Sequence, residues 1–154
     1  MIALGLSALS VLLIWIYKKP IAQHDDANKR MNEAEELRKI YSETIELISE
    51  KKYFLNKNVK LTDLASKIGH NDRLVSKAIN LHSSGNFNKF INAFRVDHSK
   101  ELLTGGEFDH YTIEAIAEES GFSNKVSFYN AFKSQVGMSP SEYKRSKQGK
   151  SWIP

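Results

Sequence analysis

The sequence contains no cysteine, and this absence excludes several classes of protein at once. Disulfide-stabilised folds, cysteine-ligated zinc fingers and thiol catalysis all require the thiol group. The chain also lacks a glycine-rich phosphate-binding loop, a G-x-S-x-G nucleophile turn and any cluster of carboxylates. The sequence therefore predicts a protein that is not an enzyme, with no catalytic residues and no cofactor.

Histidines are few and scattered, at His24, His70, His82, His98 and His110. No two of them lie four residues apart, which is the spacing that places two ligands on one face of a helix. We interpret them as surface or capping residues and predict no metal site. The formal net charge of +4 and the pI of about 9.2 are mildly basic and are compatible with a nucleic-acid partner.

Charge is absent from residues 2–17, which read IALGLSALSVLLIWIY. As a helix this run would span about 24 Å, somewhat less than the roughly 30 Å of a bilayer core. Trp15 and Tyr17 end the run and Lys18 and Lys19 follow, as at a membrane interface. The basic start and small-residue cleavage site of a signal peptide are missing. We interpret residues 1–19 as a transmembrane helix, with a buried helix of a soluble protein as the alternative.

The basic residues on one side of this run predict its orientation. Lys and Arg follow residues 2–17 and none precedes them, so the positive-inside rule places the C-terminal part in the cytoplasm. The expected location is the cytoplasmic (inner) membrane, with a single pass. A run this short, starting almost at the first residue, resembles the last helix of a larger membrane protein. We therefore expect a truncated or split form of a multi-span protein.

Residues 20–55 are rich in Glu, Lys, Arg and Leu and predict a charged helical connector, with Pro20 ending the preceding helix. A thin heptad seam runs along it, formed by Ala34, Leu37, Tyr41, Thr44 and Ile48. Two interpretations stay open. The connector is a solvated helix that joins the membrane to a domain, or residues 31–48 form a coiled coil that makes a homodimer.

Residues 112–140 predict a helix, a tight turn and a second helix. The apolar face of the first helix comes from Ile113, Ile116 and Ala117, with Thr112 as its N-cap and Gly121 in a left-handed turn position. Ser123 is expected to cap the second helix, which carries Phe128 and Phe132 one turn apart and ends at Gly137. Ser139 and Pro140 then begin a third helix. This order is the helix-turn-helix pattern, whose second helix can enter the major groove of DNA.

The same pattern occurs a second time, earlier in the chain. Leu61, Leu64, Ala65 and Gly69 match Ile113, Ile116, Ala117 and Gly121 at a constant offset, and Asn71 or Asp72 is expected to cap the next helix. Residues 86–106 lie between the copies and predict one long helix that ends at Gly105 and Gly106. Such a helix would hold two recognition helices at a fixed separation, comparable with the roughly 34 Å between major grooves on one DNA face.

These residues resemble the DNA-binding domain of the AraC/XylS family of bacterial transcription regulators. The likeness runs from about Leu61 to Tyr143. Its most specific positions are Arg95-Val96, Leu102-Leu103, Ile116-Ala117, Gly121-Phe122, Phe128, Phe132 and Gly137-Met138-Ser139-Pro140. The chain departs from the family at Ser99, where alanine is usual, and in lacking the N-terminal ligand-binding barrel. It looks more like the tail of membrane-anchored regulators whose sensor lies N-terminal.

The resemblance implies an all-α fold: two helix-turn-helix subdomains, at residues 61–81 and 113–136, joined by a long linker helix. The DNA-binding domain would cover residues 56–146, after the membrane helix and connector, with residues 147–154 as a disordered tail. Double-stranded DNA is the implied partner, and RNA polymerase is a further one. Base contacts are expected from Asp72, Arg73, Ser76 and Lys77 in the first unit and from Asn124, Lys125, Ser127 and Asn130 in the second. Lys133, Lys144 and Arg145 are the expected phosphate contacts.

Two further interpretations compete with a membrane-tethered, sequence-specific DNA reader. The first is a helical protein-interaction module, or the remnant of a larger membrane sensor-regulator, that kept the fold and lost its DNA-binding surface. Asp72 and the acidic pair Glu118–Glu119 favour it. The second is an enzyme, which the missing nucleophiles and carboxylate clusters argue against.

Overall fold

The computed structural model describes residues 5–83 and 85–147, and for residues 5–24 it describes the helical backbone only. The described residues contain α-helices and short 3-10 turns and no strand, so the all-α prediction is confirmed for them. The elements are α1 (Gly5–Glu50), η1 (Tyr53–Leu55), α2 (Leu61–Lys67), α3 (Asp72–His82), α4 (Phe87–Thr104), η2 (Gly106–Phe108), α5 (Ile113–Glu119), α6 (Lys125–Val136) and α7 (Pro140–Lys147).

The chain divides into two compact parts, residues 1–38 and residues 39–154. Helix α1 belongs partly to each of them, because it runs without a break from Gly5 to Glu50. The prediction that Pro20 ends the first helix is therefore wrong. A proline inside a helix removes one backbone hydrogen bond and crowds the preceding turn, and helical turns on both sides can compensate for this loss.

The predicted membrane segment, residues 2–17, lies outside the residues whose side chains the structure describes. Within residues 25–83 and 85–147, no helix is long and apolar enough to cross a bilayer.

The C-terminal part of α1 packs within the compact part formed by residues 39–154. Thr44 and Ile48 have no exposed surface. The Tyr41 ring lies 5.3 Å from the His82 ring and 5.8 Å from the Phe90 ring, measured between centroids. Three residues of the predicted heptad seam, Tyr41, Thr44 and Ile48, therefore pack against other residues of the same chain. A homodimer through residues 31–48 needs these side chains on its surface, so we correct that prediction: this half of the seam is occupied.

The first helix-turn-helix unit consists of α2 and α3, close to the predicted bounds of 61–81. Gly69 forms the turn with a left-handed φ of +73°, a conformation that costs a residue with a Cβ about 1–2 kcal/mol. Asn71 caps α3, where its side chain accepts a hydrogen bond of 2.9 Å from the Leu74 N–H. Val75 and Ile79 of α3 are fully buried.

The second unit consists of α5 and α6 and repeats this design. Thr112 caps α5 by accepting a 3.1 Å hydrogen bond from the Ala115 N–H, and Gly121 has a φ of +83°, so both predictions are confirmed. The cap of α6 is Asn124, whose side chain accepts a 2.8 Å hydrogen bond from the Ser127 N–H. The prediction of Ser123 as this cap is wrong by one residue, because asparagine and serine both suit the position and sequence alone does not set the register.

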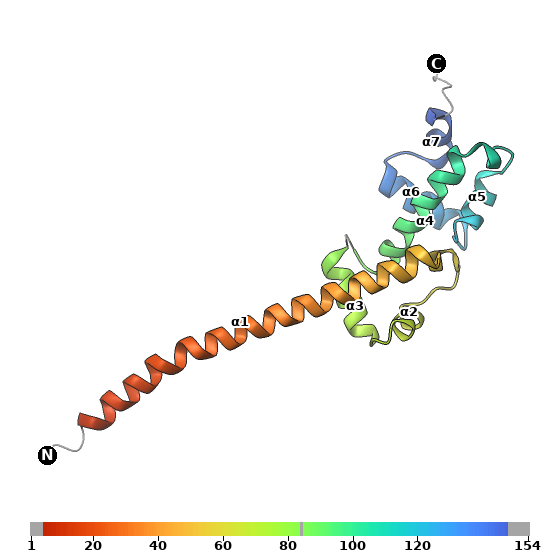
Figure 1. The fold of residues 1–154 in the computed structure, drawn as a ribbon. Helices are drawn as coiled ribbons and strands as arrows, with labels where there is room; N and C mark the ends of the chain where they lie inside the picture. Colours follow the sequence, from red (N-terminus) through yellow and green to blue (C-terminus); the bar gives the residue numbers. More distant parts are fainter. Residues whose placement is uncertain (1–4, 84, 148–154) are drawn as a thin grey trace. The chain divides into compact units, whose positions relative to one another are not determined.

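Helix α4 lies between the two helix-turn-helix units and joins them (Figure 1). Helices α2 and α3 lie toward its first turns, and α5, α6 and α7 lie toward its last turns. With 18 residues, α4 is about 27 Å long. A hydrophobic core surrounds the C-terminal half of α4 and is shared with α5 and α6. It consists of Val96, Leu102, Leu103, Ile116, Ala117, Phe122, Phe128 and Phe132. The linker is therefore also a structural part of the second unit.

Helix α7 begins with a capping box. The Ser139 N–H and hydroxyl both donate to the Glu142 carboxylate at 2.7 Å, and the Glu142 N–H donates to the Ser139 hydroxyl at 3.3 Å. These donors favour the charged carboxylate and hold the pKa of Glu142 below its ordinary value of 4.5. Ser139 and Pro140 therefore begin the helix as predicted. The predicted tail lies outside the described residues from 148 onward, while α7 extends to Lys147.

Candidate nucleic-acid interface

Arg95 of α4 ties the linker helix to the segment that precedes the first unit. Its guanidinium donates hydrogen bonds to the backbone carbonyls of Phe54 at 2.8 Å and Asn56 at 2.9 Å, and a weaker one of 3.5 Å to Asn92. The side chain lies 5.6 Å from the centroid of the Phe122 ring in the second unit. Burial lowers the pKa of this guanidinium, which remains charged at neutral pH. One side chain thus contacts α4, η1 and the second unit.

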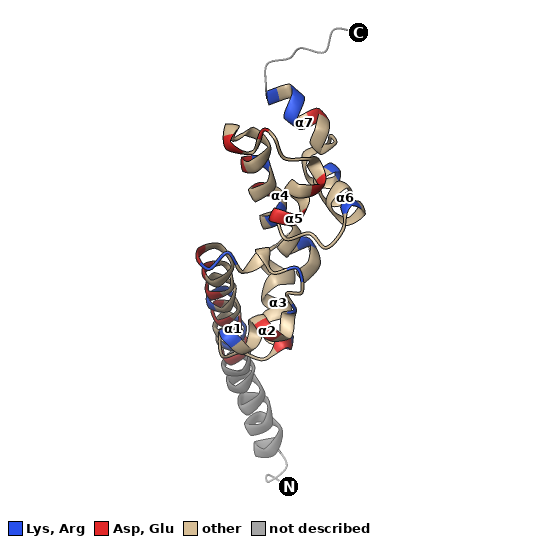
Figure 2. Ribbon diagram, turned by 90° about the vertical axis from the view of Figure 1, so that its right-hand side faces the viewer, with Lys and Arg blue, Asp and Glu red and all other residues tan. Residues whose placement is uncertain are grey.

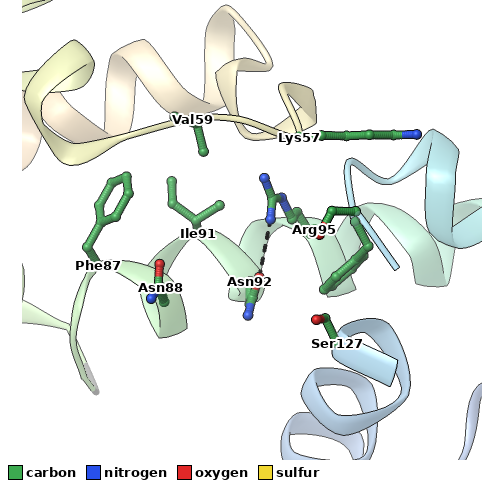
Figure 3. Close-up of a pocket in the computed structure, with 10 residues that line it drawn as sticks. Lys57, Val59, Phe87, Asn88, Ile91, Asn92, Arg95 and Ser127 are labelled. Carbon is green, nitrogen blue, oxygen red and sulfur yellow. Dashed lines mark hydrogen bonds between the residues drawn. The ribbon is translucent and has the colours of Figure 1, made fainter. Parts of the chain in front are cut away.

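A pocket of about 270 Å³ lies beside Arg95, between α4, the segment after η1 and the start of α6. Figure 3 shows the Arg95 guanidinium inside it, with Val59 and Ile91 on one side and Ser127 of α6 on the other. The pocket therefore lies where α4, the segment before the first helix-turn-helix unit and the second unit meet. Arg95 holds the first two together through its hydrogen bonds to Phe54 and Asn56.

Gly121 makes the closest backbone approach in this region. A Cβ at this position would lie 2.7 Å from the Phe54 carbonyl oxygen and 2.8 Å from the Leu55 Cα. These distances are shorter than ordinary van der Waals contact, so only glycine fits. The turn of the second unit and the η1 segment are thereby packed backbone to backbone, and this contact orients α6 relative to the first unit.

The outer face of α3 brings together most of the residues predicted for base contacts in the first unit. Arg73, Ser76 and Lys77 line one surface groove with Asn80 and Leu81. Asn80 and Leu81 were not predicted from the sequence. They lie seven and eight residues after Arg73, a spacing that places them on the same helix face as Arg73 and Lys77. Asp72 is exposed at the first position of α3, outside this groove.

In the first turn of α6, two of the residues predicted to contact bases have partners within the protein. Asn124 uses its side-chain oxygen as the helix cap. The Lys125 ammonium forms an ion pair with the Glu114 carboxylate of α5. Each partner stabilises the charged form of the other, so the pKa of Lys125 is raised and that of Glu114 is lowered. This pair fixes α5 to the start of α6, a role that sequence spacing does not indicate.

Other residues form the outward face of α6. Val126, Asn130 and Lys133 follow one another at i, i+4 and i+7, and all three are exposed, opposite the buried Phe128 and Phe132. Ser127 is also exposed and borders the pocket beside Arg95. The predicted residues Ser127, Asn130 and Lys133 therefore stand on the surface, together with Val126, which the sequence analysis did not select.

The two predicted phosphate contacts of α7 differ in their surroundings. The Lys144 ammonium donates to the Asp109 carbonyl at 3.2 Å, and its side chain is only 16% exposed. Lys144 thus joins α7 to the loop before α5, and its assignment as a phosphate contact stays a prediction. Arg145 is exposed. Figure 2 shows Lys and Arg on both α6 and α7.

Two tandem helix-turn-helix units on one linker helix, each presenting a polar face on its second helix, define a class of DNA-binding domain. Within residues 25–83 and 85–147, no group of three or more His, Asp or Glu side chains could hold a metal ion. The family model described as "Helix-turn-helix domain" matches residues 64–146, which is more than half of the chain. The chain belongs to this helix-turn-helix family, and its DNA-binding domain is of the AraC/XylS type.

Several known proteins are similar to this chain. The TCP pilus virulence regulatory protein of Vibrio cholerae is 33% identical over 90 residues, which are 58% of this chain and 31% of that protein. The C-terminal domain of AraT, a response regulator from Geobacillus stearothermophilus, is 23% identical, with a TM-score of 0.58 over 77% of this chain and 90% of that chain. The DNA-binding domain of AdpA, a global transcriptional factor solved with a target DNA, is 17% identical, with a TM-score of 0.61 over 72% of this chain and 95% of that chain.

The two structural likenesses show a shared fold. The matched part spans about a third of the length of the Vibrio relative. The family and these relatives point to a DNA-binding transcription regulator and not to an enzyme.

Proposed function

We propose that residues 39–154 form a sequence-specific DNA-binding domain of a transcription regulator, which reads two adjacent major-groove segments with α3 and α6. The observation that carries this proposal is the fixed pairing of two helix-turn-helix units. Helices α3 and α6 both pack on the 18-residue linker helix. Arg95 of that helix binds the segment before the first unit and contacts Phe122 of the second, and Gly121 of the second unit packs against η1. A protein that only needed a helical core would gain nothing from two exposed second helices on a rigid spacer.

The exposed side chains have the chemistry that base and phosphate recognition needs. Arg73 and Lys77 on α3 suit the acceptor pair of guanine, and Asn130 on α6 suits adenine. Lys133 on α6 and Arg145 on α7 are exposed cations that suit phosphate oxygens, which supply affinity and salt dependence without sequence information. Two similar proteins support this proposal: the virulence regulatory protein of Vibrio cholerae and the DNA-binding domain of AdpA, which was solved with a target DNA.

The test uses the full chain in mild detergent and selects binding sites from random duplex DNA. We expect two enriched sequence blocks about one helical turn apart, with affinity that falls steeply as salt rises. The double substitution Arg73→Ala with Lys77→Ala should weaken binding to the selected site by about tenfold or more, because each good contact contributes roughly 1–3 kcal/mol. It should also relax the sequence preference in one block only.

A matched control removes the same charge elsewhere. Lys39→Ala with Lys51→Ala takes two exposed cations from the helix α1 side of the unit and should change the affinity much less. If no sequence is enriched, or if both double variants weaken binding equally, the proposed base readout is refuted. The first of these results would favour a protein-interaction module built on the same fold.

We also propose that residues 2–17 anchor the chain in the cytoplasmic membrane, with the DNA-binding domain, residues 39–154, in the cytoplasm. The uncharged run, its terminal Trp15 and Tyr17 and the following Lys18 and Lys19 support this assignment. The chain should stay in the membrane fraction after alkaline carbonate extraction, and Leu12→Arg with Leu13→Arg should release it. Release of the unsubstituted chain by carbonate would contradict the anchor.

A further inference from the structure

The two second helices of the helix-turn-helix units each expose one large apolar side chain. The exposed large apolar residues among those described are Met31, Leu81, Val126 and Met138, and Val126 is the most exposed of them at 68%. Val126 is the second residue of α6, while Leu81 lies near the last turn of α3. Recognition helices contact base edges chiefly with their N-terminal residues, so Val126 has the position from which a base can be reached.

The neighbours of Val126 are already engaged within the protein. Asn124 caps the helix through its side chain, and Lys125 is paired with Glu114. The first turn of α6 therefore presents Val126 and Ser127 outward, with Asn130 one turn further along the same face as Val126. The cation Lys125 begins this helix but is paired with Glu114, and Val126 is the apolar side chain that the turn exposes beside it.

A branched apolar side chain has one chemical partner on the floor of the major groove. The C5-methyl group of thymine is the apolar group that base pairs present there, and the adjacent acceptor and donor of adenine suit an asparagine. We propose that Val126 packs on a thymine methyl group in the DNA segment read by α6, so that α6 selects A·T pairs with Val126 and Asn130. This inference rests on the proposed function and names the base class that the second unit recognises.

Deoxyuridine tests this contact, because it differs from thymidine only by the methyl group. In the site selected by the full chain, each thymine of both blocks is replaced in turn by uracil, and dissociation constants are measured in mild detergent. We expect one thymine in the α6 block whose replacement weakens binding about fourfold, the effect of burying one methyl-sized group. The remaining replacements in that block should have smaller effects.

The substitution Val126→Ala completes a thermodynamic cycle. Because Val126 is exposed and alanine favours helices, the variant should fold as the parent does, which circular dichroism will check. It should bind the thymine site about fourfold more weakly than the parent and should no longer distinguish thymine from uracil at the identified position. Val126→Thr, which keeps one methyl group, should retain part of the discrimination. Met31→Ala is the control for loss of an exposed apolar side chain outside residues 39–154, and it should leave the cycle unchanged.

The outcomes separate this inference from the function on which it rests. If specific DNA binding occurs but no thymine-to-uracil change in the α6 block matters, the inference is overturned and the proposed function stands. The same holds if Val126→Ala keeps the full discrimination, because another side chain then reads the methyl group. If the chain selects no DNA sequence, both the proposed function and this inference are overturned.

Discussion

The substitution Gly121→Ala is expected to destabilise the domain by about 2–5 kcal/mol. Two independent costs add at this position. A φ of +83° costs a residue with a Cβ about 1–2 kcal/mol. The new Cβ would also lie 2.7–2.9 Å from backbone atoms of Phe54 and Leu55, and forcing extra atoms into a packed core costs roughly 1–3 kcal/mol. Urea unfolding followed by circular dichroism measures the sum.

Gly69→Ala is the matched control, because Gly69 holds the equivalent turn of the first unit. Its φ is +73°, and no atom lies within 4 Å of an added Cβ. Only the conformational cost remains there, so we expect a loss of about 1–2 kcal/mol. Equal losses at the two glycines would show that the approach of η1 to the second unit contributes nothing to stability.

The substitution Arg95→Met is expected to lower the free energy of unfolding by about 2–4 kcal/mol. Methionine preserves much of the side chain's volume but donates no hydrogen bond. The carbonyl groups of Phe54 and Asn56 would then lose the donors that they have at 2.8 and 2.9 Å. The Phe54 carbonyl is buried, and a buried acceptor left without a partner costs roughly 1–3 kcal/mol; Asn56 is an exposed residue, so loss of its hydrogen bond adds about 1 kcal/mol or less. Because Arg95 also joins the linker helix to η1 and contacts Phe122 of the second helix-turn-helix unit, we expect weaker binding to a bipartite DNA site as well.

Lys100→Met on the same helix serves as the control for the lost charge. Lys100 forms an ion pair with Asp97 at 2.8 Å, and its side chain is 35% exposed. Pairs of this kind contribute at most about 1 kcal/mol, so its effect on unfolding should be small. If Arg95→Met destabilises the domain no more than Lys100→Met does, the proposed tie between η1, α4 and the second unit is wrong.

Much of the fold follows from local patterns in the sequence. The matching spacing of Leu61, Leu64 and Gly69 with Ile113, Ile116 and Gly121 predicted both helix-turn-helix units, and the left-handed glycines confirm their turns. These features depend on helix periodicity, capping chemistry and the conformational freedom of glycine. All three act over a few residues, so a single sequence records them.

The individual roles of polar side chains at the interface were less predictable. Lys125 is a cation on the predicted recognition helix, but its partner Glu114 lies 11 positions earlier in sequence and reaches it only when α5 packs on α6. Lys144 likewise meets Asp109 across 35 positions. A list of residue types on a helix cannot show which of them already have partners. The sequence therefore could not show that these predicted contact residues also have partners within the protein.

The sequence by itself determined the two repeated units, the long linker helix, the caps and the absence of cysteine chemistry, because each depends on residue type and short-range spacing. Only the tertiary structure decided that Gly121 meets the backbone of η1, that Arg95 joins the linker to that segment, and that Thr44 and Ile48 are buried in this domain. It also decided that Val126 stands at the exposed start of α6. These features depend on contacts between residues far apart in the chain, and such contacts form only when the helices pack.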